Sequence, residues 1–174
     1  MRTLFFYIIV CFTLHTYSQS KYITKSGSVS FEASVPSFEE VKAVNNSVTA
    51  ITNIENNEFA ALVLVKGFRF KNALMEEHFN ENYAESSTYP KATFKGKIIQ
   101  KNNKNEIEGE LTFHGKSKYI KGIPITYIKK DKYIEIAGHF TVSVSDFDIK
   151  IPKIVQNKVS ESVNITFVFD LESK

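Results

Sequence analysis

The feature that most constrains this chain is an alternation of apolar and polar residues that recurs along most of its length. Every second residue is apolar between residues 28 and 35, and the same pattern runs through residues 162–171. A period of two places successive side chains on opposite faces of a β-strand. Further segments with strand character lie near residues 47–54, 59–70, 92–98, 106–114, 119–128 and 133–144. The sequence therefore predicts about eight strands, most of them at hairpin spacing.

One short helix interrupts this pattern between residues 72 and 89. Asn72 can accept hydrogen bonds from the first free amides of a helix. Pro90 cannot lie in a helix interior, so the helix must end before it. A face with spacings of three and four is predicted to turn inward. It comprises Leu74, Met75, His78, Phe79 and Tyr83. A lone helix in a β chain is expected to cover or plug one end of the sheet.

Eight strands are enough to close a β-barrel. The interior of an eight-stranded barrel just holds side chains or one slender ligand. A two-sheet sandwich is the alternative from the pattern alone. The chain of 174 residues shows no internal repeat and no linker, so residues 19–174 are predicted to form one domain.

Residues 1–18 have the features of a secretory signal peptide. Arg2 supplies the positive start, and the apolar run from Leu4 to Leu14 is too short to span a bilayer. Cleavage is expected after Ser18, with Ser20 as the second choice, and a retained membrane anchor is the alternative. The mature protein is therefore predicted to be periplasmic or secreted.

Composition excludes several classes of function. Cys11 is the only cysteine and lies inside the leader, so the mature chain has no thiol for a disulfide, a metal or a nucleophile. The formal charge is +3 and lysines are scattered, which is typical of a solvated exterior and not of a nucleic-acid footprint. Because the net charge is positive, we expect a weak, transient attraction to anionic lipid head groups.

Motifs for catalysis are sparse. The sequence contains neither a Gly-x-Ser-x-Gly elbow nor a Gly-rich phosphate loop. We therefore expect a protein that is not an enzyme and carries no cofactor. One alternative is a metal-dependent enzyme, which would require His114, His139 and a glutamate to converge within metal-bond reach.

Several motifs in the same order resemble the YceI-like family of bacterial proteins, in an exported form of the Bacteroidetes type. The similar segments begin at Gly27 (Gly-Ser-Val-Ser-Phe-Glu-Ala), Phe68 (Phe-Arg-Phe), Met75 (Met-Glu-Glu-His-Phe), Tyr89 (Tyr-Pro-Lys-Ala-Thr-Phe-Lys-Gly), Glu108 (Glu-Gly-Glu-Leu-Thr-Phe-His-Gly-Lys) and Phe140 (Phe-Thr-Val-Ser-Val-Ser-Asp-Phe-Asp-Ile). The resemblance covers about residues 27–171. It implies an eight-stranded antiparallel lipocalin-like β-barrel with one inserted short helix. Better-known members of the family bind long isoprenoid lipids inside the barrel.

Aromatic residues gather in the central stretch and supply the candidate binding site. The family resemblance implies that they line a tunnel for an isoprenoid-type ligand, such as a polyprenyl lipid or an isoprenoid quinone. Arg69, His78 and Tyr83 are the candidates for contact with a polar head, and Arg69 suits a phosphate. The candidate ligand-binding residues are Phe68, Arg69, Phe70, Met75, His78, Phe79, Tyr83 and Phe94. The alternative is a barrel filled by these side chains, acting as an interaction or stress-related module without a small ligand.

Overall fold

The alternating segments of the sequence form antiparallel strands. The computed structural model describes residues 20–36 and 38–174. The strands are β1 (Lys21–Ser34), β2 (Lys42–Asn53), β3 (Glu58–Leu64), β4 (Arg69–Phe70), β5 (Lys91–Lys101), β6 (Lys104–Phe113), β7 (Lys116–Lys129), β8 (Tyr133–Ser143) and β9 (Val159–Ser173). The helical elements are the short turn η1 (Val65–Gly67), the helix α1 (Ala73–His78), the π-helical turn η2 (Phe79–Tyr83) and the turn η3 (Val144–Phe147).

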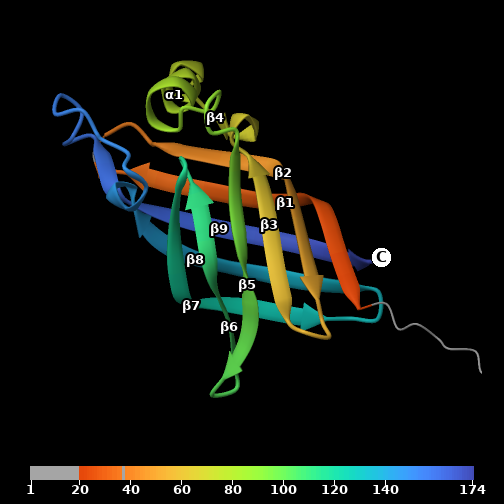
Figure 1. Cartoon of the computed structure of the whole chain (residues 1–174). Coiled ribbons are helices and arrows are strands. Elements are labelled where there is room, and N and C mark those ends of the chain that lie inside the picture. The colour runs from red at the N-terminus through yellow and green to blue at the C-terminus, as the bar shows by residue number, and fades with distance from the viewer. Residues whose placement is uncertain (1–19, 37) are drawn as a thin grey trace, which may run out of the picture.

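Eight of the strands close into a barrel (Figure 1). Their order is β1-β9-β8-β7-β6-β5-β3-β2, and antiparallel pairing between β2 and β1 completes the ring. The two-residue strand β4 is an addition that pairs with the start of β2, where Ala43 faces Phe70. The predicted eight-stranded barrel with one inserted helix is confirmed, and the sandwich alternative is wrong.

The first strand starts earlier than its alternation indicates. Tyr22 and Thr24 are buried and belong to β1, which was expected to begin near residue 28. The pairing of β1 with β2 shifts register between Thr24 and Gly27. A β-bulge adds a residue to one strand and so changes the phase of its alternation. That phase change hides the first part of the strand from a pattern search.

The second strand also starts earlier, at Lys42, in a region expected to be a bend or a helical turn. Its pattern is obscured because the inward position 45 is polar. Asn45 is 1% exposed; its amide donates to the Leu64 carbonyl at 2.9 Å and accepts from the Ser47 amide at 2.9 Å. A Cβ atom at Gly67 would lie 2.5 Å from Asn45 Nδ2, so only glycine lets the chain approach Asn45 this closely.

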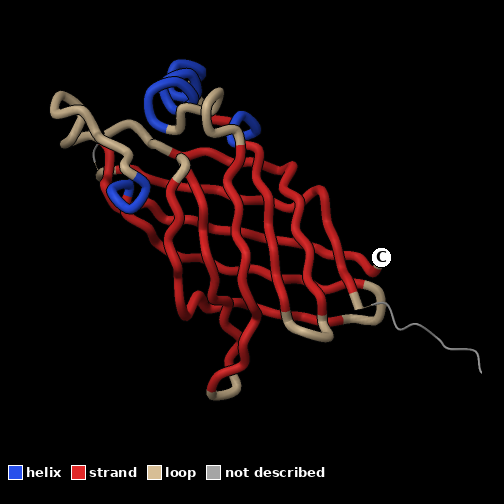
Figure 2. The backbone as a smooth tube through the Cα atoms, in the orientation of Figure 1, coloured by secondary structure: helices blue, strands red, loops and turns tan. Residues whose placement is uncertain are grey.

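The two ends of the barrel differ in what closes them. One end, called here the mouth, carries the helix α1 with η2, the turn at residues 114–115, the segment 144–158, and residues 35–36 and 38–41 (Figures 1 and 2). Tight connections at residues 54–57, 102–103 and 130–132 lie at the other end. Within the described residues, no helix is both long and apolar enough to cross a membrane.

The half of the barrel away from the mouth is filled. Ala50, Ile134, Ile136 and Leu171 each have no exposed surface, and they pack in the hydrophobic core. The interior of an eight-stranded barrel is narrow enough for side chains of this size to fill it, so this half has no room for a ligand. Any internal binding site must therefore lie in the half next to the mouth.

Candidate functional site

The half of the barrel next to the mouth contains a cavity of about 550 Å³. Its walls are almost entirely apolar and come from every long strand except β2, together with the mouth loops. Exposed residues such as His78 and Lys158 belong to its lining, so the cavity reaches solvent at the mouth. Its volume is within the range of about 300–1,000 Å³ that is usual for small-molecule sites.

Aromatic rings form the floor of the cavity. Phe59 packs against Phe169 with ring centroids 5.8 Å apart and against Phe94 at 6.1 Å. Phe167 stacks on Phe169 at 5.4 Å. All four residues line the cavity, and each is at most 9% exposed. The floor is thus a rigid aromatic layer between the hollow and the filled halves of the barrel.

A second aromatic cluster forms the cover beneath the helix. Phe79 of η2 lies 5.1 Å from Phe31 of β1, 5.8 Å from Phe68 and 5.3 Å from Phe70, measured between ring centroids. Such offset and edge-on pairs add to the stabilisation from burial. Phe79 therefore attaches the helical segment to the barrel, and all four rings face the cavity.

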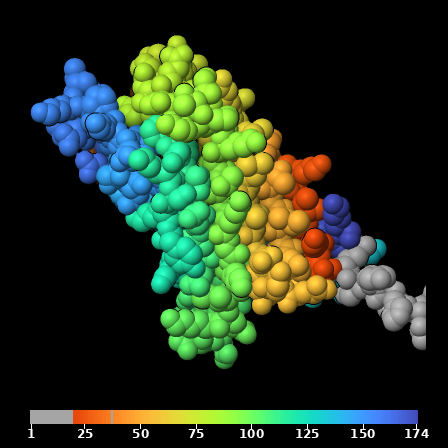
Figure 3. All heavy atoms as spheres, in the orientation of Figure 1, coloured from red at the N-terminus to blue at the C-terminus, as the bar shows by residue number. Residues whose placement is uncertain are grey.

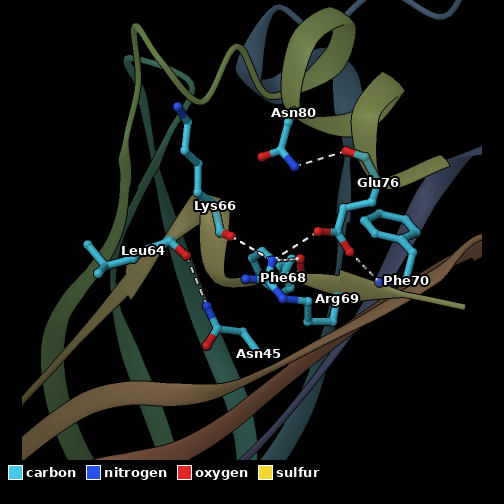
Figure 4. Close-up of polar contacts among 8 residues, drawn as sticks. All are labelled: Asn45, Leu64, Lys66, Phe68, Arg69, Phe70, Glu76 and Asn80. Carbon is cyan, nitrogen blue, oxygen red and sulfur yellow. Dashed lines mark hydrogen bonds and ion pairs between the residues drawn. The ribbon is translucent and has the colours of Figure 1, made fainter. Parts of the chain in front are cut away.

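Polar contacts fix the helix over this cluster (Figure 4). The Asn72 side chain accepts from the amides of Leu74 and Met75, which confirms it as the helix cap. The Glu76 carboxylate accepts from the Phe70 amide at 3.1 Å and from the Arg69 guanidinium at 3.0 Å. Glu76 therefore links the helix to β4, a role that no sequence pattern predicts.

The structure places Arg69 away from the cavity. Its guanidinium also donates to the carbonyls of Lys66 and Phe68, and its side chain is 67% exposed. Arg69 and Phe70 are adjacent in β4, so their side chains point to opposite faces. The other seven candidates do line the cavity: Phe68, Phe70, Met75, His78, Phe79, Tyr83 and Phe94. Leu74 was expected to face inward, but it is 57% exposed because α1 covers the barrel along a narrow stripe only.

The sequence did not identify part of the lining, which comes from the segment between β8 and β9. Phe147, Ile149, Ile151 and Val155 line the cavity, although this stretch was expected to be only a connection. The recurrence of apolar residues in this loop, at positions 147, 149, 151, 154 and 155, is the feature that could have indicated it. The few polar residues in the lining are Glu39, His78, Tyr83, Thr93 and Lys158.

His114 connects the three structures that surround one side of the mouth. His114 and Gly115 both have positive φ, as a two-residue type I′ hairpin turn requires. The Nδ1–H of His114 donates to the Phe147 carbonyl at 2.9 Å, and its ring lies edge-on to Tyr89 with centroids 4.7 Å apart. Its Nε2 faces Glu85 Oε1 at 3.5 Å. The histidine therefore joins the β6–β7 hairpin to η3 and to the segment after the helix.

Replacing His114 with alanine should lower the free energy of unfolding by about 1–3 kcal/mol, because the carbonyl of the buried Phe147 loses its partner. Urea unfolding measures this change. His139→Ala is the matched control, since His139 is exposed on the wall of the barrel. Equal effects for the two variants would contradict the connecting role of His114.

Asp146 holds η3 in place through its carboxylate. It accepts from the Lys118 ammonium and from the Ser143 amide at 3.0 Å, closing a capping box. The hydrogen bond from Lys118 is the main cause of a lowered pKa for Asp146, opposed by partial desolvation and assisted by the Ser143 amide. The folded state thus favours the ionised form more than the unfolded state does.

The lowered pKa of Asp146 predicts how the free energy of unfolding depends on pH. The contribution of Asp146 is present above its ordinary pKa and is lost as the pH falls through its lowered pKa. Unfolding free energies measured between about pH 5 and pH 2 should therefore fall more steeply for the natural protein than for Asp146→Asn. Asp131→Asn, in an exposed turn at the opposite end, should leave the slope unchanged.

The structure does not assemble the metal-binding residues of the enzymatic alternative. His139 pairs with Thr166 on the outer wall, whereas His114 contacts Phe147 and Glu85 at the mouth. Within residues 20–36 and 38–174, no group of three His, Cys, Asp or Glu residues could hold a metal ion. The alternative therefore lacks a ligand set in this part of the chain.

Comparison with known proteins agrees with this architecture. The family described as the YceI-like domain matches residues 21–171, which is most of the chain. The chain belongs to the YceI-like domain family. This result confirms the family resemblance seen in the sequence motifs. A comparison with curated proteins gave no match.

Solved structures share the fold at low sequence identity. BcnA of Burkholderia cenocepacia is 19% identical with a TM-score of 0.71, and the match covers 83% of this chain and 95% of that protein. A polyisoprenoid-binding domain from Saccharophagus degradans is 12% identical with a TM-score of 0.74, over 90% and 100% of the two chains. The YceI protein of Campylobacter jejuni is 18% identical with a TM-score of 0.65, over 80% and 89%.

Proposed function

We propose that this protein is an exported, non-enzymatic binding protein that holds a long, thin, apolar molecule in the barrel. The ligand class is an isoprenoid-type lipid, either a polyprenyl lipid or an isoprenoid quinone. The observation that carries the proposal is the cavity of about 550 Å³ behind the mouth, with its aromatic floor and cover. A filled barrel would have no such volume.

The cavity favours a ligand whose buried part has almost no polar atoms. Burying one methylene group contributes about 0.8 kcal/mol, so about ten would contribute about 8 kcal/mol before the cost of ordering the ligand. A charged or hydrogen-bonding group would lose its water contacts in the apolar interior without gaining partners. The tail of the ligand therefore lies toward the floor formed by Phe59, Phe94, Phe167 and Phe169.

The polar head of the ligand belongs at the mouth. Glu39, His78 and Lys158 are exposed members of the lining there, and the half-buried Tyr83 lies on the same helical segment as His78. These groups can offer hydrogen bonds to a quinone or hydroxyl head that stays partly in water. Arg69 is not part of this arrangement, since Glu76 and two carbonyls occupy its guanidinium.

Two further observations support the proposal. A domain of the same fold from Saccharophagus degradans is described as polyisoprenoid-binding. Export is supported by the sequence of residues 1–18, with Arg2 followed by a short apolar run. These residues lie outside the described part of the structure, so the leader and its cleavage after Ser18 stay predictions.

A series of isoprenoid quinones with tails of increasing length tests the proposal. Affinity should rise with each added isoprene unit until the cavity is full and then level off, while the head group alone should not bind. Tight binding of the tailless quinone would contradict a tail-binding cavity. Failure of the whole series to bind would favour a module without a small ligand. Native mass spectrometry with equal concentrations of each quinone provides the comparison.

A further inference from the structure

The segment between η3 and β9 begins with Asp148, which pairs with Lys116 at 2.7 Å, and then combines apolar and basic residues without a further acidic one. Residues 149–158 read Ile-Lys-Ile-Pro-Lys-Ile-Val-Gln-Asn-Lys, and this run is called the basic loop below. Ile154 is 86% exposed, the highest value among the large hydrophobic residues that the structure describes as exposed. An isoleucine held in water next to lysines has the pattern of a segment that meets an anionic lipid surface.

The basic loop stands directly beside the mouth. Ile149, Ile151 and Val155 line the cavity, while Ile154 at the loop tip points its apolar surface to solvent. Figure 3 shows the loop and the helical segment as two separate lobes at the same end of the barrel. Phe38, in the loop before β2, and Leu74, in α1, lie at the same end and are 49% and 57% exposed. Exposed apolar residues thus surround the opening.

The charges at the mouth decide which lobe would meet an anionic surface. Lys150, Lys153 and Lys158 are exposed, and none of them forms an ion pair with any residue in the described ranges 20–36 and 38–174. The helical lobe instead carries Glu77 and Glu81 on its exposed side. A negatively charged bilayer would attract the basic loop and repel the helical lobe, which sets the orientation of contact.

We propose that the basic loop docks the mouth of the barrel onto a bilayer that contains anionic phospholipid. Ile154 enters the apolar layer, and Lys150 and Lys153 contact the phosphates on either side. The cavity then opens against the bilayer, so that an apolar tail can pass between the two without crossing water. This docking role extends the proposed ligand-binding function, on which the transfer step rests, but contact with the bilayer itself does not need an occupied cavity.

Vesicle flotation tests the docking directly, with the protein as purified from its own cells. The probe is vesicles of equal parts phosphatidylglycerol and phosphatidylcholine, compared with vesicles of phosphatidylcholine alone. At low salt, binding to the anionic vesicles should weaken about tenfold in Ile154→Ser. It should weaken about thirtyfold in the double variant Lys150→Gln/Lys153→Gln, and added salt should reduce the binding of the natural protein.

Matched controls come from the opposite end of the barrel. Ile128→Ser removes an isoleucine that is 40% exposed near the end of β7, and Lys101→Gln/Lys104→Gln removes two exposed lysines beside the β5–β6 turn. These variants should bind vesicles like the natural protein. The proposal is overturned if the control pairs weaken binding as much as the loop variants, or if the natural protein binds neutral and anionic vesicles equally.

One further variant separates the docking from the ligand-binding function. Ala61→Phe, which fills part of the cavity, should bind the quinone about fiftyfold more weakly and keep its vesicle binding. The loop variants should bind quinone added from detergent as tightly as the natural protein does. If the natural protein binds vesicles but not quinone, the proposed function alone is contradicted. If the natural protein binds quinone but not anionic vesicles, the docking alone is contradicted.

Discussion

Filling the cavity by Ala61→Phe is expected to weaken binding of a long-tailed isoprenoid quinone by about fiftyfold. Ala61 lies on the inward face of β3 opposite Phe94, and its side chain lines the cavity. A phenyl ring there occupies volume that the tail would otherwise fill. Excluding about three methylene groups costs about 2.4 kcal/mol, which corresponds to about fiftyfold in affinity.

The neighbouring residue provides the control. Ala60 precedes Ala61 in β3 and points to the outer wall, so Ala60→Phe adds the same ring outside the barrel. This variant should bind the quinone with unchanged affinity. Equal binding by both variants would show that the tail does not pass Ala61. Thermal unfolding of both proteins checks that neither has lost its fold.

Phe79→Ala is expected to loosen the cover of the cavity and lower the free energy of unfolding by about 2–3 kcal/mol. Phe79 contacts the rings of Phe31 in β1, Phe70 in β4 and Phe68 just before β4, and its truncation leaves a gap among them. A fully buried Phe→Ala change costs about 3–5 kcal/mol, and Phe79 is half-buried. Guanidinium unfolding gives the stability, and amide hydrogen exchange across residues 73–89 reports the cover itself.

Leu74→Ala in the same helix is the control for that measurement. Leu74 is 57% exposed, so its truncation should change stability by less than about 0.5 kcal/mol. Exchange of the amides of β8 should stay slow in both variants, because the filled half of the barrel does not depend on the cover. Uniformly faster exchange in Phe79→Ala would show that the helical segment is not a separate unit.

The sequence predicts the barrel because the wall obeys a simple rule. A strand with one face inside and one face in water must alternate, and β9 does so over most of its length. The cap at Asn72 and the break at Pro90 are equally local, and both were found. The failures at the starts of β1 and β2 arise where a register shift or the buried Asn45 breaks the alternation.

The cavity could not be predicted because it is a difference between two volumes. Phe113, Phe140 and Ile165 face inward like the residues of the filled half, yet they leave space between them. Whether such side chains meet depends on the width of the barrel and on their rotamers, which no periodicity encodes. The direction of Arg69 was equally inaccessible, since it depends on the position of Glu76 seven residues later.

The division of the barrel into two halves connects stability to the proposed function. The filled half supplies a complete apolar core without a disulfide, since the only cysteine of the chain is Cys11. The hollow half can therefore stay open and still be held in a folded protein. The cover at Phe79 and the link at His114 define the sides of the opening without closing it.

The most direct test is native mass spectrometry of the protein purified from its own cells, followed by organic extraction of the same sample. The account predicts one bound molecule of lipid mass per barrel, and an extract that contains an isoprenoid quinone or polyprenyl lipid. The Ala61→Phe variant prepared in parallel should carry little of it. A bare protein mass, together with no uptake of added isoprenoid quinones, would contradict the account and leave the aromatic cavity without a ligand role.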